Sequence, residues 1–183
     1  MTPFEQAFKI LIGEEGGLST NPADPGNWTG GACDKGVCRG TKFGIAASAH
    51  PELDIAALTL SQAQAIYRTS YWDPVRGDAL PPPLALLVFD ATVNCGASRA
   101  VRWLQAAAGV EVDGDLGDVT LAAVRDAPGG GTALCAELQA QRLTWMVALP
   151  TWRSFGLGWS RRLCLLPYQA LGMEASSAAS PGA

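Results

Sequence analysis

Apolar residues recur at helical spacing at the start of the chain. They fit one face of an amphipathic helix over residues 3–14, because side chains three and four positions apart share a helix face. Gly16 and Gly17 are expected to end this helix, since glycine enters left-handed backbone space at little steric cost. The apolar positions that define the face are Phe4, Ala7, Phe8, Leu11 and Ile12.

Further helices are predicted after residue 44, and two of them carry distinct patterns. Residues 84–96 are apolar on nearly all sides, which is typical of a helix buried at the centre of a domain. Residues 98–109 are amphipathic and end at a glycine. The other predicted helices span residues 44–51, 61–72, 118–127 and 132–148. Ser61 is expected to cap the second of these, and the third is expected to be a capped helix that follows a turn at 113–117. Residues 173–183 are expected to form a disordered tail.

Residues 18–44 follow neither pattern. They are rich in glycine, proline, asparagine and aspartate, which favours turns and a short hairpin. The sequence contains no internal repeat. The chain is therefore predicted to adopt an α+β fold that is mostly helical, with one irregular, β-containing region near the N-terminus.

Composition and charge narrow the class of partner. The 183 residues fit one domain, and the hydrophobic share of 48% is enough for a sizeable core. The formal net charge of −4 argues against a nucleic-acid partner, which requires a basic face. The N-terminal residues resemble neither a signal peptide nor a membrane span, so we expect synthesis in the cytoplasm and no membrane insertion.

Glu15 is a candidate general acid because of its place at the end of the first predicted helix. The negative end of the helix dipole disfavours an ionised carboxylate, and an apolar cleft wall would add to that effect, so both raise its pKa. A general acid that works near neutral pH requires a raised pKa. The alternative is that Glu14 and Glu15 are solvated residues at a helix end.

Asp24 is the next carboxylate along the chain. Glycosidic cleavage uses a pair of carboxylates, one to protonate the leaving oxygen and one to activate water or stabilise the oxocarbenium-like centre. Asp24 also stands in an Asp-Pro-Gly sequence, which is a common turn, so a structural role is the alternative.

The single histidine, His50, limits the rival chemistries. Zinc amidases and peptidases need two histidines or a cysteine cluster. A cysteine amidase that pairs Cys95 with His50 stays open as a remote alternative. The acidic stretch at residues 113–120 breaks the ligand order of a calcium loop, so we expect no metal ion and no other cofactor.

Two further features concern the irregular region. Trp28 lies among glycines and is a candidate for stacking on a sugar face, whereas the other tryptophans are expected in the core or at interfaces. Cys33 and Cys38 flank a short loop, and whether they form a disulfide is left open.

Two stretches of the sequence together resemble a known family. The stretch "EEGGLSTNPADPGNWTGG…GTKFGI" is similar to the opening motifs of the glycoside hydrolase family 108 N-acetylmuramidases, common among phage endolysins. "YWDPVRGDALP" and "FDATVNCGASRAVRWLQAAAGVEVDGDLGDVTLAAV" resemble the peptidoglycan-binding segment that accompanies them. The similarity covers residues 5–148, and the order of the motifs is more specific than any one of them.

The resemblance implies a lysozyme-like fold, with a cleft between a small irregular lobe and a larger helical lobe, and cleavage of the β-1,4 bond between N-acetylmuramic acid and N-acetylglucosamine. It implies that Glu15 is the catalytic acid, with Asp24 as second carboxylate and Thr41 near the attacking water. The long loop after Asp24 makes Thr29 a competitor of Thr41. Trp28, Tyr71 and Asn94 are candidates for substrate binding.

The expected protein is thus a monomeric muramidase that acts on bacterial peptidoglycan. We expect a single lysozyme-like domain over residues 1–172, with a catalytic loop region at 14–48 and a peptidoglycan-binding-type segment at 80–127. The alternatives are a lytic transglycosylase acting on the same bond and a non-catalytic wall-binding or virion structural protein. Action in the periplasm or cell wall would require holin-type release or injection.

Overall fold

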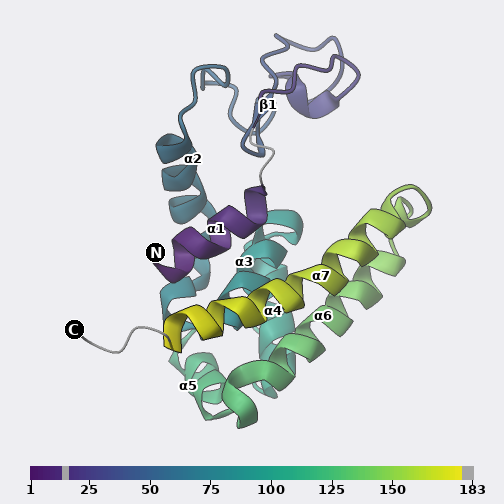
Figure 1. The fold of residues 1–183 in the computed structure, drawn as a ribbon. Coiled ribbons are helices and arrows are strands. Elements are labelled where there is room, and N and C mark those ends of the chain that lie inside the picture. The colour runs from purple at the N-terminus through teal and green to yellow at the C-terminus, as the bar shows by residue number, and fades with distance from the viewer. Residues whose placement is uncertain (14–16, 179–183) are drawn as a thin grey trace. The chain divides into compact units, whose positions relative to one another are not determined.

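The computed structural model describes residues 1–13 and 17–178, and the described residues are mostly helical (Figure 1). The chain divides into two compact units, one formed by residues 8–68 and the other by residues 1–7 and 69–183. The helices are α1 (Pro3–Ile12), α2 (Leu60–Tyr67), α3 (Pro82–Cys95), α4 (Ala97–Ala108), α5 (Asp118–Asp126), α6 (Thr132–Val147) and α7 (Trp152–Ala178), and the strands are β1 (Thr41–Lys42) and β2 (Ile45–Ala46).

Most of the predicted helices are confirmed, and three details are wrong. The prediction of a helix at 44–51 is wrong, because this stretch forms β2 and turns. Ser61 does not cap α2; Thr59 does, in a capping box with Gln62. The helix at 118–127 is present as α5, but its N-cap is Gly117 and lacks a side-chain cap. The predicted tail at 173–183 begins inside α7, which continues to Ala178.

The buried centre of the larger unit is α3, which contacts α4, α6 and α7 (Figure 1). Its residues from Pro83 to Thr92 are all buried, as the apolar pattern on all sides predicted. Phe4 and Trp72 pack edge-to-face against each other, with ring centroids 5.4 Å apart, and each also contacts Phe89 of α3. The aromatic cluster therefore joins the N-terminal residues to the core of this unit.

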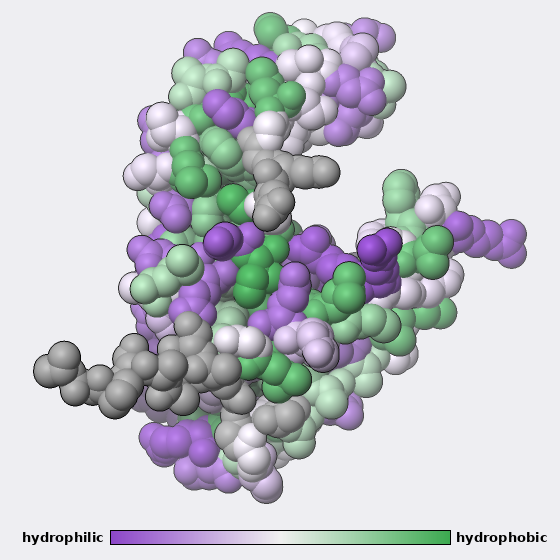
Figure 2. All heavy atoms as spheres, viewed as in Figure 1, coloured by the Kyte–Doolittle hydropathy of each residue, from purple (hydrophilic) through white to green (hydrophobic). Residues whose placement is uncertain are grey.

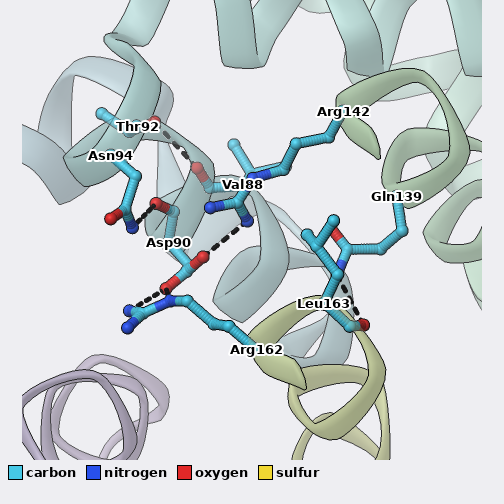
Figure 3. Close-up of polar contacts among 8 residues, drawn as sticks. All are labelled: Val88, Asp90, Thr92, Asn94, Gln139, Arg142, Arg162 and Leu163. Carbon is cyan, nitrogen blue, oxygen red and sulfur yellow. Dashed lines mark hydrogen bonds and ion pairs between the residues drawn. The ribbon is translucent and has the colours of Figure 1, made fainter. Parts of the chain in front are cut away.

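One charge lies in the middle of α3. Asp90 is fully buried, and its carboxylate accepts hydrogen bonds from Arg142 of α6, at 2.5 Å, and from Arg162 of α7 (Figure 3). Burying a carboxylate is unfavourable unless cations and donors replace its water. The ion pairs therefore fix the positions of α6 and α7 against α3.

The last helix, α7, contains Pro167, which would normally break a helix. Proline has no backbone N–H to donate to the carbonyl four residues earlier, here that of Leu163. The side-chain amide of Gln139, on α6, donates to this carbonyl oxygen at 3.3 Å instead (Figure 3). A side chain from the neighbouring helix thus replaces the hydrogen bond that the proline removes.

The smaller unit is built around a short antiparallel hairpin, in which Thr41 pairs with Ala46 and Lys42 with Ile45. Gly44 turns the chain at φ +75°, and a Cβ there would lie 2.5 Å from the hydroxyl oxygen of Tyr67. That hydroxyl donates to the carbonyl oxygen of Phe43 at 3.2 Å. Glycine is therefore required at this turn both by its conformation and by the close approach of α2.

Within residues 1–13 and 17–178, none of the helices combines the length and the hydrophobicity that crossing a bilayer requires. On the viewed surface, hydrophobic and hydrophilic residues are interspersed (Figure 2).

Candidate active site

The predicted general acid, Glu15, lies outside the described residues, as does its neighbour Glu14. The structure therefore describes the part of the candidate site that follows them, from Gly17 to the hairpin. This part belongs entirely to the unit formed by residues 8–68.

Asp24 caps a short 3-10 turn formed by Pro25–Asn27. One carboxylate oxygen, Oδ1, accepts a hydrogen bond from the backbone N–H of Gly26 at 2.9 Å. The side chain is exposed, and its Oδ2 has no partner among the described residues. Asp24 thus fills the turn role expected of an Asp-Pro-Gly sequence and keeps one oxygen available to a ligand or water.

Thr41, at the start of β1, is held by a buried amide. Its hydroxyl donates to Oδ1 of Asn27 at 2.7 Å. Asn27 is fully buried, and its Nδ2 donates to the backbone carbonyl of Asn21 at 2.9 Å. Because both ends of this amide are engaged, the Thr41 hydroxyl has a fixed orientation, and its lone pairs can still accept a hydrogen bond.

Asn27 is also the residue that links Asp24 to Thr41. Its backbone N–H donates to the carbonyl of Asp24 at 3.1 Å, and its own carbonyl accepts from the backbone N–H groups of Arg39 and Gly40. The turn with Asp24 and the strand with Thr41 are therefore connected through one residue. Asn27 is not among the residues predicted for the site, although an asparagine two residues after an Asp-Pro pair is typical of a turn that the side chain stabilises.

Thr29, the competitor of Thr41, serves a different purpose. Its hydroxyl oxygen accepts a hydrogen bond from the backbone N–H of Val37 at 2.9 Å, across the base of the inserted loop. A Cβ on Gly36 would lie 2.2 Å from this oxygen, so the hydroxyl is enclosed by the loop. Thr29 is thus engaged within its own loop, and the assignment of Thr41 rather than Thr29 to the site stays a prediction.

The other features of the loop are Trp28 and two cysteines. The indole N–H of Trp28 donates to the carbonyl of Pro22 at 2.9 Å, and the ring is partly exposed. Cys33 and Cys38 are both free thiols in the structure. Stacking of Trp28 on a sugar stays a prediction. The hydrogen bond from its indole N–H to Pro22 is compatible with such stacking.

Tyr71 and Asn94 belong to the other unit. Tyr71 is partly exposed in a π-helical turn that follows α2, at Arg68–Trp72. Asn94 lies near the end of α3, where its Nδ2 donates to the carbonyl of Asp90 at 2.7 Å. Asp24, Asn27 and Thr41 are thus brought together by the fold of one unit, whereas Tyr71 and Asn94 lie in the other unit.

The cysteine alternative is disfavoured by the environment of Cys95. Burial raises the pKa of its thiol, and the nearby guanidinium groups of Arg142 and Arg99 lower it only in part. A nucleophilic cysteine needs a lowered pKa, because the thiolate is the reactive form. The Nδ1 atom of His50 lies 3.5 Å from the carboxylate of Glu52, within the unit formed by residues 8–68.

The acidic stretch after α4 also has a structural task. Asp113 accepts hydrogen bonds from the backbone N–H of Asp115 at 2.8 Å and from the side chain of buried Gln105 at 2.6 Å, and these donors lower its pKa. Among the described residues, no group of three or more histidine, cysteine or acidic side chains has an arrangement suited to a metal ion.

Comparisons with known proteins place these features in a family. Residues 8–96 match the family model described as glycosyl hydrolase 108, and residues 99–164 match a model described as a predicted peptidoglycan domain. The comparison with curated proteins gives no match.

A solved structure, SagA from Brucella abortus, is similar to the chain over nearly its whole length. It shares 33% sequence identity and a TM-score of 0.75, and the alignment covers 92% of this chain and 94% of SagA. The lysozyme-like α+β fold expected from the sequence is therefore confirmed. This chain belongs to the glycosyl hydrolase 108 family.

Proposed function

We propose that the protein is an N-acetylmuramidase that hydrolyses the β-1,4 bond between N-acetylmuramic acid and N-acetylglucosamine in bacterial peptidoglycan. The two family matches support a glycosyl hydrolase with a peptidoglycan-binding-type segment. The observation that carries the finer proposal is the exposed Asp24 carboxylate joined through Asn27 to the oriented Thr41 hydroxyl.

In this proposal Glu15 protonates the glycosidic oxygen as the bond to the sugar breaks. Asp24 faces the positive charge that develops at the anomeric carbon, or accepts a proton from the attacking water. The Thr41 hydroxyl already donates to Asn27, so its free lone pairs are left to accept a hydrogen bond from that water. A lytic transglycosylase would need no such water, which is why the arrangement favours hydrolysis.

The proposal extends to the setting in which the enzyme acts. We take it to work as a monomer on the bacterial wall, reached by release or injection. The formal net charge of −4 does not suit a polyanionic substrate, which would be bound by many lysine and arginine side chains. We therefore expect the substrate to be a neutral or mildly charged polymer.

Replacement of Glu15 by glutamine tests the proposal, with Glu14→Gln as the matched control. Glutamine keeps the shape but cannot donate the proton, so release of reducing ends from purified peptidoglycan should fall at least ~100-fold. Glu14→Gln removes the same charge one residue away and should stay within about twofold of the wild type, since such a variant keeps the whole catalytic step. Equal losses in both variants, or none in Glu15→Gln, would refute Glu15 as the acid.

A further inference from the structure

A cavity of about 420 Å³ lies where the end of α3 meets the beginning of α4 and the side of α6. Its lining contains none of the candidate catalytic residues, and all of it belongs to the unit formed by residues 1–7 and 69–183. A cavity of this size fits a ligand as large as a monosaccharide or a dipeptide. Its lining includes the side chains of Cys95, Ser98, Arg99, Arg102, Trp103 and Trp145.

Two guanidinium groups line this cavity. Arg99 lies over the ring of Trp145, with 4.2 Å from its Cζ atom to the ring centroid, and its Nη1 donates to the carbonyl of Cys95 at 2.9 Å. Arg102 is exposed and has no ion pair or hydrogen bond among the described residues. A Cβ on Gly114, which lies at φ +87°, would come within 2.9 Å of its Nε. Stacking and a hydrogen bond thus hold Arg99 at the cavity, and Arg102 lies beside Gly114 in its lining.

The beginning of α4 adds backbone donors to the same place. The residue before the helix is Gly96, at φ 87° and ψ 147°, and it offers no side-chain cap. The backbone N–H groups of Ala97, Ser98 and Arg99 consequently have no partner within the described part of the chain. Uncapped N–H groups at a helix N-terminus and adjacent guanidinium groups both favour an anion.

The acidic groups nearby offset only part of this charge. Asp113, whose ionised form is stabilised by the donors of Asp115 and Gln105, interacts electrostatically with Arg102 and forms no ion pair with it among the described residues. Asp90 is neutralised by Arg142 and Arg162. Arg142 is itself fully buried beside Cys95, and its Nε and Nη2 have no hydrogen-bond partner among the described atoms. Positive charge therefore prevails around the cavity.

The walls of the cavity suit a ring or a planar group. Trp103 and Trp145 lie 5.9 Å apart between ring centroids, at an interplanar angle of 58°, and both are partly exposed. Tryptophan faces pack against sugar rings and peptide planes, while guanidinium groups bind planar carboxylates with two hydrogen bonds. Tryptophan faces beside guanidinium groups therefore suit a ligand in which a carboxylate is attached to a sugar ring or a peptide.

We propose that this cavity binds a carboxylate carried by peptidoglycan, held by Arg99, Arg102 and the N-terminus of α4, with the adjoining ring or peptide packed against Trp103 and Trp145. The identity of the ligand rests on the proposed function, since peptidoglycan offers such carboxylates in the lactyl group of muramic acid and in the stem peptide. The cavity is then a second contact with the wall, made by the segment that follows the catalytic part of the chain.

Binding of three small probes to the full-length protein tests this proposal. The probes are N-acetylmuramic acid with a free lactyl carboxylate, the stem dipeptide L-alanyl-D-isoglutamate, and N-acetylglucosamine, which has a similar ring and no carboxylate. The readout is the NMR shift of the indole N–H groups of Trp103 and Trp145, assigned with the phenylalanine variants. One carboxylate probe should move both signals saturably and identify the source, whereas N-acetylglucosamine should leave them in place.

Arg102→Gln gives the decisive variant, because this side chain makes no ion pair among the described residues and its loss should not unfold the protein. It should weaken binding of the carboxylate probe roughly tenfold, Arg102→Lys less, and Arg153→Gln, an exposed arginine on α7, not at all. Equal shifts with N-acetylglucosamine, stronger binding of inorganic phosphate, or unchanged affinity in Arg102→Gln would overturn the proposal.

The two proposals fail in different ways. Binding of the small probes is measured without turnover, so the affinity of Arg102→Gln for the carboxylate probe tests the cavity, and reducing-end release by Glu15→Gln tests the hydrolase. Probe binding without any release of reducing ends would support the cavity and refute the hydrolase mechanism. Release of reducing ends without probe binding would refute the cavity alone.

Discussion

At the scale of single residues, we expect the two threonines of the irregular region to differ, with Thr41 acting in catalysis and Thr29 in folding. Thr41→Val removes a hydroxyl that Asn27 orients, so reducing-end release should fall by about tenfold or more. Thr29→Val removes a hydroxyl that accepts from Val37, so it should lower the melting temperature and change the turnover of the folded protein by less than about threefold.

Kinetics and thermal unfolding of both variants check this distinction. If Thr41→Val kept normal turnover while Thr29→Val lost it, the threonine of the site would be Thr29. Sequence alone left the two open, because the contact between Thr41 and Asn27 joins residues that are 14 positions apart.

Asp90 is a buried charge that pairs with two arginines in the larger unit. Asp90→Asn leaves Arg142 buried without a counter-charge, which should cost about 3–5 kcal/mol of unfolding free energy. The matched control is Asp118→Asn, which breaks the exposed pair with Arg76 and should have a much smaller effect. Urea denaturation measures both, and equal losses would contradict the role given to the buried charge.

At the scale of elements, α7 is the helix that sequence patterning missed. Gly156, Gly158 and Pro167 all disfavour a helix by their intrinsic propensities. The helix forms because α6 compensates, with Gln139 replacing the hydrogen bond lost at Pro167 and Arg142 sharing Asp90 with Arg162. Contacts between helices cannot be read from a local sequence pattern. The helices α3 and α4 could be predicted because the spacing of their apolar residues indicates which positions are buried.

Two glycines of α7 should respond in opposite ways to alanine. A Cβ on Gly158 meets nothing within 4 Å, so Gly158→Ala should stabilise the protein by about 0.5–1 kcal/mol through its helix propensity. A Cβ on Gly156 would lie 2.7 Å from the Trp152 ring, so Gly156→Ala should destabilise it. Thermal unfolding gives both signs, and stabilisation by both variants would show that Trp152 is not packed as described.

The hairpin region illustrates the same limit in the smaller unit. Its glycine- and proline-rich composition predicted turns and a short hairpin, and these are confirmed. The helix expected at 44–51 failed because Ile45 and Ala46 pair with Lys42 and Thr41 across the turn at Gly44. A pairing across so tight a turn overrides the helical preference of the alanines that follow.

At the scale of the whole molecule, the two family matches and the two compact units divide the chain differently. The glycosyl hydrolase match ends at residue 96 and includes α3, yet α3 packs with α4, α6 and α7 in the larger unit. The segment matched by the peptidoglycan model, residues 99–164, therefore depends on α3 for its buried face. The single lysozyme-like domain expected over residues 1–172 stays a prediction, and shared use of α3 supports it.

The candidate site was predictable in its parts and not in its connections. Motif resemblance predicts Asp24 and Thr41 as site residues, and the structure adds Asn27 as the residue that joins them. The cavity beside α4 had no sequence signal, because Arg99 and Arg102 are ordinary positions on the polar face of an amphipathic helix. Only the approach of Trp145 from α6 turns that face into a binding surface.

The reducing-end products of purified peptidoglycan test the central claim most directly. After exhaustive digestion by the wild-type protein and borohydride reduction, mass spectrometry should find reduced muramic acid at the new chain ends. Digestion in ¹⁸O-labelled water should place the label on that sugar, because hydrolysis takes its oxygen from water. Anhydro-muramic ends would show a transglycosylase instead, reduced glucosamine ends a different bond, and the absence of new ends would contradict a glycoside hydrolase altogether.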